Sequence, residues 1–129
     1  MSNTDPNDVS SSPLPGVPQE RRQFPRTHVK WRATILSPQP VTNVMVIEIS
    51  DVGFGFVGDV AYKIGTQLSF QLSVPDPLVG HLWHTVLGQI EVMSSILTRD
   101  GFRAGVLIKS INAAHQDLLK AWVKLRLHE

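Results

Sequence analysis

The chain has 129 residues, which is enough for one domain with a modest core and too few for two ordinary ones. Its formal net charge is only +1 and 42% of its residues are hydrophobic, so the composition is that of a soluble globular protein and not of a strongly basic polyanion-binding chain. There is no cysteine, which excludes disulfide bonds and thiolate metal sites.

Residues 1–19 are predicted to form a disordered tail, because Ser, Pro, Asn and Asp dominate them and they show no periodic apolar pattern. The tail lacks the basic start and apolar run of a signal peptide, and no segment approaches the roughly 20 apolar residues that span a bilayer. We therefore expect a cytoplasmic protein without membrane insertion. Residues 21–32 contain five basic residues and no acid, so a short basic stretch follows the acidic tail.

The first strands are predicted from alternating apolar residues. Alternation from Val29 to Ile35 indicates a half-buried strand, SPQP at 37–40 indicates a turn, and a second strand runs from about 41 to 50. A glycine-punctuated bend and a short strand, DVGFGFVGD, follow. In the second strand the parity places Met45, Ile47 and Ile49 on one side, and Val44, Val46, Glu48 and Ser50 on the other, outward side.

Three further strands and a helix complete the predicted elements. Residues 66–74 alternate cleanly, residues 82–97 form a long strand, and residues 102–111 return after the hairpin turn TRDG, where Asp-Gly supplies the positive φ that such turns need. From Asn112, a predicted N-cap, apolar residues recur at helical spacing as far as Leu125. We expect an antiparallel barrel or sandwich whose open mouth is covered by this helix.

Glu48, Ser50 and Gly53 form the first candidate site. On one outer face, a carboxylate and a hydroxyl would offer an acceptor and a donor to one ligand, and Gly53 would let the backbone turn or let a ligand approach closely. The same residues also fit a polar strand end followed by a glycine turn, and the local pattern alone favours that structural interpretation.

Arg21, Arg22 and Arg26 form the second candidate site. Guanidinium groups bind phosphates and the O6 and N7 acceptors of guanine with paired hydrogen bonds, and they stack on bases. Pro25 disfavours helix at Phe24, so we expect these arginines on an extended loop. A solvated basic linker is the alternative interpretation.

No catalytic or metal-binding constellation is recognisable. His81 and His84 would face opposite sides of a strand, and we find no carboxylate near them, so we expect no metal site. No serine lies in a nucleophile elbow and no glycine-rich loop carries a P-loop lysine. We expect a protein that is not an enzyme and that needs no cofactor.

The two candidate sites together resemble the signatures of the PilZ domain family, bacterial receptors for the second messenger cyclic di-GMP. The family carries R-x-x-x-R in an N-terminal loop, which Arg22 and Arg26 match, with Arg21 as the additional preceding arginine. It carries [D/N]-x-S-x-x-G at a strand end, which Ser50 and Gly53 match. GQIEVMSSILTRDGFRAGVLIKSI is similar to the late hairpin of the family, and a closing helix follows.

The resemblance covers residues 20–127 and implies a mainly β fold. Its core is an antiparallel six-stranded PilZ-type β-barrel with a C-terminal α-helix and a disordered N-terminal tail. The implied PilZ domain spans residues 20–129. It consists of an arginine loop at 20–28, a barrel at 29–111 and a helix at 112–128.

The resemblance also implies a cyclic di-GMP receptor in which the loop folds over the ligand and its change of state signals to an effector protein. The arginines would meet phosphates and guanine acceptors, Glu48 and Ser50 would hold guanine, and Gly53 would give clearance. The implied ligand-binding residues are Arg21, Arg22, Arg26, Glu48, Ser50 and Gly53. Glu48 departs from the family, which has Asp or Asn there. Its longer side chain costs more rotamer entropy to fix, so we expect weaker binding.

Two alternatives stay open at this point. Because of Glu48, the chain fits a PilZ-like protein–protein adaptor that no longer binds the nucleotide. A small barrel that binds single-stranded nucleic acid is disfavoured, because the strand faces lack an aromatic stacking platform, and we expect no DNA or RNA partner. The resemblance names neither the effector protein nor the ligand stoichiometry, and it leaves a homodimer open.

Overall fold

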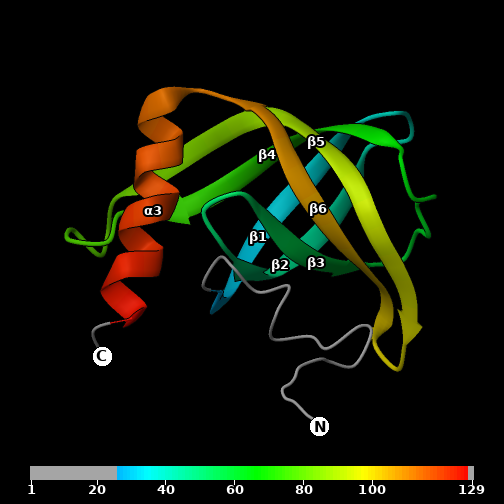
Figure 1. Ribbon diagram of the computed structural model, residues 1–129, viewed down its shortest axis with the longest axis horizontal. Helices are drawn as coiled ribbons and strands as arrows, with labels where there is room; N and C mark the ends of the chain where they lie inside the picture. The colour runs from blue at the N-terminus through cyan, green and yellow to red at the C-terminus, as the bar shows by residue number, and fades with distance from the viewer. Residues whose placement is uncertain (1–25, 128–129) are drawn as a thin grey trace, which may run out of the picture.

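The computed structural model describes residues 26–127, which fold into six strands followed by one helix (Figure 1). The predicted tail and residues 20–25 of the predicted arginine loop lie outside the described residues. The strands are β1 (Thr27–Ser37), β2 (Thr42–Ile49), β3 (Gly53–Gly58), β4 (Gln67–Pro75), β5 (Trp83–Thr98) and β6 (Gly101–Ile111), and the helix is α3 (Ala113–Leu127).

The six strands close into an antiparallel barrel in the order β1-β2-β3-β6-β5-β4, with β1 pairing to both β2 and β4. This confirms the predicted barrel with one C-terminal helix. The first strand begins at Thr27, so Thr27 and His28 belong to β1 and not to the preceding loop. Because closure leaves no free sheet edge, every strand has a fixed neighbour on both sides.

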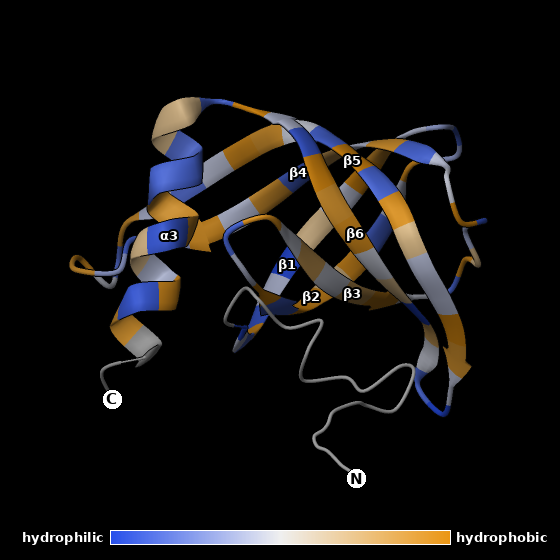
Figure 2. Ribbon diagram, in the orientation of Figure 1, coloured by the Kyte–Doolittle hydropathy of each residue, from blue (hydrophilic) through white to orange (hydrophobic). Residues whose placement is uncertain are grey.

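The core is formed by the inward residues of the strands and by two residues of α3. Figure 2 shows apolar and polar residues alternating along the strands. In β4, Leu68, Phe70, Leu72 and Val74 are almost fully buried, as the alternation predicts. Phe70 meets Phe54 of β3 edge to face with ring centroids 5.1 Å apart, a favoured aromatic geometry.

The predicted parity of β2 is wrong over its first half. Val44 and Val46 are buried, whereas Met45 and Ile47 are only partly covered. The register of the β2–β3 pair shifts between Val46 and Glu48, and such a bulge reverses the faces that follow it. Ile49 therefore points into the core and Glu48 points outward, as predicted.

Two turn and cap predictions agree with the structure. Gly101 closes the β5–β6 hairpin with a φ of +125°, a conformation that L side chains rarely adopt. Asn112 caps α3, because its Oδ1 accepts a hydrogen bond of 2.8 Å from the Ala114 N–H.

α3 packs at one end of the barrel, opposite the β5–β6 hairpin (Figure 1). Leu119 and Val123 bury their side chains in the core. Trp122 meets Trp31 of β1 edge to face at 5.4 Å and donates a hydrogen bond of 2.6 Å to the Pro75 carbonyl. Leu125 is exposed, in contrast to the predicted apolar face. The helix is thus attached to both β1 and the end of β4.

We expect Trp122→Ala to lower the free energy of unfolding by about 3 kcal/mol, because it removes a large packed ring and one hydrogen bond. Urea unfolding followed by circular dichroism measures this. Leu125→Ala on the same helix is the control and should cost less than about 0.5 kcal/mol. Equal losses in the two variants would contradict the attachment through Trp122.

Candidate functional site

A cluster of three charged residues lies on the outer wall of the barrel. Arg26 immediately precedes β1, Glu48 lies on β2 and Arg103 lies on β6. Arg26 Nη1 and Arg103 Nη2 each lie 3.1 Å from the same oxygen, Oε2 of Glu48. The Glu48 side chain is 13% exposed, against 49% for Arg26 and 40% for Arg103, so the two cations cover the carboxylate. We call these three residues the charged triad.

Gly55 on β3 makes the charged triad possible. β3 lies between β2 and β6, and Gly55 is opposite Glu48 on one side and Gly105 on the other. A Cβ at position 55 would lie 3.1 Å from Cγ and 3.3 Å from Oε2 of Glu48, closer than most real contacts. Glu48 and Arg103 lie on strands two apart, which are separated by roughly 10 Å, and the missing side chain at Gly55 leaves room for the Glu48 side chain over β3.

Ser50 and Gly53 form a tight turn directly after β2. The Ser50 hydroxyl accepts hydrogen bonds from the Val52 N–H at 3.3 Å and the Gly53 N–H at 3.2 Å, and it lies 3.3 Å from the Gly53 carbonyl. Ser50 is only 8% exposed, so the prediction that it faces outward is wrong. The reason is that its hydroxyl group bonds to the backbone of this turn. A Cβ on Gly53 would lie 2.0 Å from the Val106 carbonyl oxygen, so close packing against β6 already requires glycine there.

A hollow of about 360 Å³ lies over the charged triad and the Ser50 turn. Its far rim comes from β5, where Met93 and Ile96 are exposed. The structure therefore brings Arg26, Glu48, Ser50 and Gly53 together, whereas Arg21 and Arg22 lie outside the described residues.

Arg103, Gly55 and the β5 rim were missed by the sequence reasoning. Arg103 is separated from Glu48 by 55 residues, and only the strand register brings the two together. The sequence indicates Arg103 only as a basic residue at an outward position of the hairpin formed by β5 and β6.

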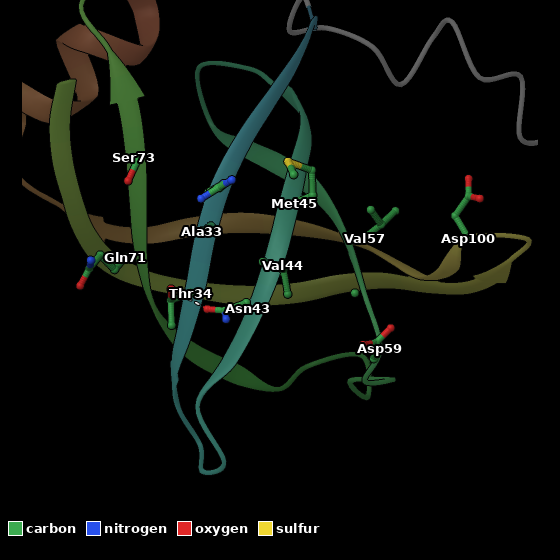
Figure 3. A pocket seen from close by; sticks show the side chains of 12 residues that line it. Ala33, Thr34, Asn43, Val44, Met45, Val57, Asp59, Gln71, Ser73 and Asp100 are labelled. Carbon is green, nitrogen blue, oxygen red and sulfur yellow. Dashed lines mark hydrogen bonds between the residues drawn. The ribbon is translucent and has the colours of Figure 1, made fainter. Parts of the chain in front are cut away.

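A larger hollow, of about 630 Å³, lies on the outer face of β4, β1, β2 and β3 (Figure 3). Gln71 and Ser73 lie at one side of it, and Asp59 and Asp100 at the other. Its charged residues are one guanidinium, Arg32, and two carboxylates, so negative charge is in excess. The smaller hollow has two guanidiniums and one carboxylate, so only that hollow suits an anionic ligand.

Comparisons with known proteins give a match of fold. No protein-family profile matches the chain, and no curated protein matches it significantly. The inhibitor of motility MotI/DgrA of Bacillus subtilis superimposes with a TM-score of 0.74 at 18% identity, over 83% of this chain and 51% of that one. The PilZ domain of YcgR from Escherichia coli, solved with c-di-GMP, gives a TM-score of 0.51 at 12% identity, over 80% of this chain and 88% of that one. This chain has a PilZ-type fold.

A second structure, YcgR of Escherichia coli in complex with c-di-GMP, gives a TM-score of 0.65 at 11% identity, over 84% of this chain and 46% of that one. This PilZ-type chain therefore spans about half the length of MotI/DgrA and of that YcgR chain.

A hydrogen-bonded aspartate–histidine pair joins the loop after β4 to the start of β5. His84 Nε2 lies 2.9 Å from Asp76 Oδ2, so the expectation that no carboxylate lies near the histidines is wrong. Asp76 Oδ1 accepts hydrogen bonds from the Leu78 and Val79 N–H groups. The hydrogen bond from His84, followed by those from the two backbone N–H groups, lowers the pKa of Asp76 to about 2.

Between residues 26 and 127, no group of three or more metal-binding side chains comes together. Over the same residues, no helix is long and apolar enough to cross a membrane.

We expect the free energy of unfolding of Asp76→Asn to fall less steeply than that of the wild type as the pH decreases below about 5. The folded pKa of about 2 lies below the ordinary value of 3.8, so the carboxylate stabilises the fold at higher pH, and this contribution is lost as the pH falls through that window. Urea unfolding at several pH values between about 5 and 2 measures the change. A variant that keeps the wild-type slope in this window would contradict the assignment.

Ser50→Ala should lower the free energy of unfolding by about 1–3 kcal/mol, because the Val52 and Gly53 N–H groups lose their acceptor. Denaturant unfolding measures the loss. Ser110→Ala, an exposed serine-to-alanine change on β6, is the control and should be close to neutral. A neutral Ser50→Ala would show that the turn does not depend on the hydroxyl.

Proposed function

We propose that this protein is a cyclic di-GMP receptor of the PilZ family that acts as a non-enzymatic adaptor for an effector protein. The observation that carries the proposal is the contact between Arg26 and Glu48, which belong to two signatures far apart in the sequence and meet at 3.1 Å on the wall of a PilZ-type barrel. The cyclic di-GMP bound to the structurally similar YcgR supports the choice of ligand.

The charge of the hollow fits this ligand. Cyclic di-GMP is a dianion, and the hollow carries two guanidiniums against one carboxylate. Arg21 and Arg22 precede Arg26 in the sequence and would add positive charge. Guanidinium groups pair with phosphate oxygens and with guanine O6 and N7, so one arginine cluster can serve both parts of the ligand.

Glu48 and the Ser50 turn supply the fixed half of the proposed site. Both ion pairs of Glu48 use Oε2, and we propose that Oε1 accepts an N–H from the edge of guanine. The Ser50 hydroxyl holds the turn, so we propose that it acts by fixing the backbone beside the ligand. Gly53 lets this wall pack directly against β6, because a Cβ there would meet the Val106 carbonyl oxygen.

The position of Arg26 suggests how binding becomes a signal. It stands where the chain enters β1, so a ligand that engages Arg26 also acts on the preceding residues, which include Arg21 and Arg22. We propose that this segment closes over the ligand and that its new arrangement is what the effector protein recognises.

A second candidate function is a protein–protein adaptor that no longer binds the nucleotide. The observation in its favour is that Glu48 already pairs with both guanidiniums, so a ligand must compete with an internal carboxylate. A titration with the nucleotide separates the two functions.

We expect saturable micromolar binding of cyclic di-GMP in isothermal titration calorimetry with the full chain. Arg26→Ala and Arg22→Ala should each weaken binding about 10- to 100-fold, as the loss of charge-assisted hydrogen bonds predicts. Arg32→Ala removes an arginine that lines the larger hollow and is the matched control, with unchanged affinity. No heat from the wild-type protein at high micromolar nucleotide would reject the receptor and favour the nucleotide-free adaptor.

A further inference from the structure

Arg103 is the third residue of β6, next to the β5–β6 hairpin, and it is separated from Glu48 by 55 residues in the sequence. Its neighbours across the ladder are Val57 on β3 and Ile96 on β5, so β6 is held on both sides at this position. Arg26, by contrast, immediately precedes β1. Arg103 therefore offers a guanidinium from a rigid element, and groups on rigid elements bind with little loss of backbone entropy.

The two guanidiniums of the charged triad converge on one point. Arg26 Nη1 and Arg103 Nη2 both lie 3.1 Å from Glu48 Oε2; Arg26 approaches from the start of β1, and Arg103 approaches across β3 from β6. A guanidinium has five N–H donors, and each ion pair uses one of them. Donors from both arginines are thus directed at an oxyanion, and both residues line the same hollow.

Stability alone does not account for this arrangement. Exposed ion pairs add little to folding, and Arg26 and Arg103 are both substantially exposed. The other cation of β6 with a carboxylate partner is Lys109, which lies 3.6 Å from Glu91 and does not line the hollow. Arg103 differs because it shares its carboxylate with a signature arginine and faces the proposed ligand.

We propose that Arg103 is a further ligand-binding residue, which brackets one phosphate of the nucleotide together with Arg26, and that Glu48 positions both guanidiniums before the ligand arrives. This inference rests on the proposed function and adds a contact from the late hairpin to it. The site then has one arginine from each side of the hollow.

Calorimetric titration of cyclic di-GMP into the full chain tests the proposal. Arg103→Ala should bind about 10- to 100-fold more weakly than the wild type. Arg103→Lys keeps the charge without the planar fork and should lie between the two. Lys109→Ala removes a paired cation from the same strand outside the hollow and should bind within about twofold of the wild type. Thermal unfolding checks that each variant is folded.

The Glu48→Gln background separates direct contact from an indirect effect. Removing Arg103 alone leaves Glu48 less well compensated, and a freer carboxylate would repel a dianion without any contact from Arg103. If Arg103 touches the phosphate, Arg103→Ala should weaken binding by a similar factor in the Glu48→Gln background. If the loss disappears there, Arg103 acts only by neutralising Glu48, and the proposed contact is wrong.

The outcomes also separate this inference from the proposed function. If Arg26→Ala loses affinity while Arg103→Ala binds like the wild type, the receptor stands and the role of Arg103 is rejected. If the wild-type protein does not bind the nucleotide at all, the proposed function fails, and this inference fails with it.

Discussion

Closure of the barrel is the constraint on which the rest of the structure depends. β1 pairs with β2 on one side and with β4 on the other, so no strand can slide without breaking a ladder on each side. This fixed register aligns Glu48, Gly55, Gly105 and Ser94 in one row across β2, β3, β6 and β5. That row forms part of the floor of the hollow, and the same register places Arg103 two residues along β6 from Gly105, within reach of Glu48. A slipped register would move Glu48 away from Arg103 and would place side chains where the floor now has bare backbone.

The two hollows of the outer wall differ in the sign of their excess charge. The triad leaves one positive charge in excess at the smaller hollow, whereas the larger hollow has an excess of negative charge. The overall charge of +1 hides this separation. The electrostatic potential near each hollow is therefore set by the local arrangement of charges and not by the charge of the whole molecule. The core, in contrast, is almost entirely apolar and gains its stability from burial.

The sequence predicted the parts of the fold that depend on local alternation. β1 and β4 follow their period closely, and the Asp-Gly hairpin and the Asn112 cap follow from local turn chemistry. The parity of β2 was wrong because a bulge adds a residue that alternation cannot anticipate. The PilZ resemblance carries long-range information and assigned Arg26 and Glu48 to one ligand site, but it did not predict the ion pair between them. Arg103 and the Asp76–His84 contact were not predicted, because only the folded arrangement brings these residues together.

Gly55 has a consequence for how this barrel tolerates change. A methyl group there would already press on the Glu48 side chain. A larger group would fill the space beside the ion pair between Glu48 on β2 and Arg103 on β6. The size of the side chain at position 55 thus limits how closely the side chains of β2 and β6 can approach each other over β3. In a related barrel with a bulky residue at this position, the acidic residue of β2 would need other partners. The arginine of β6 would then not form an ion pair with it.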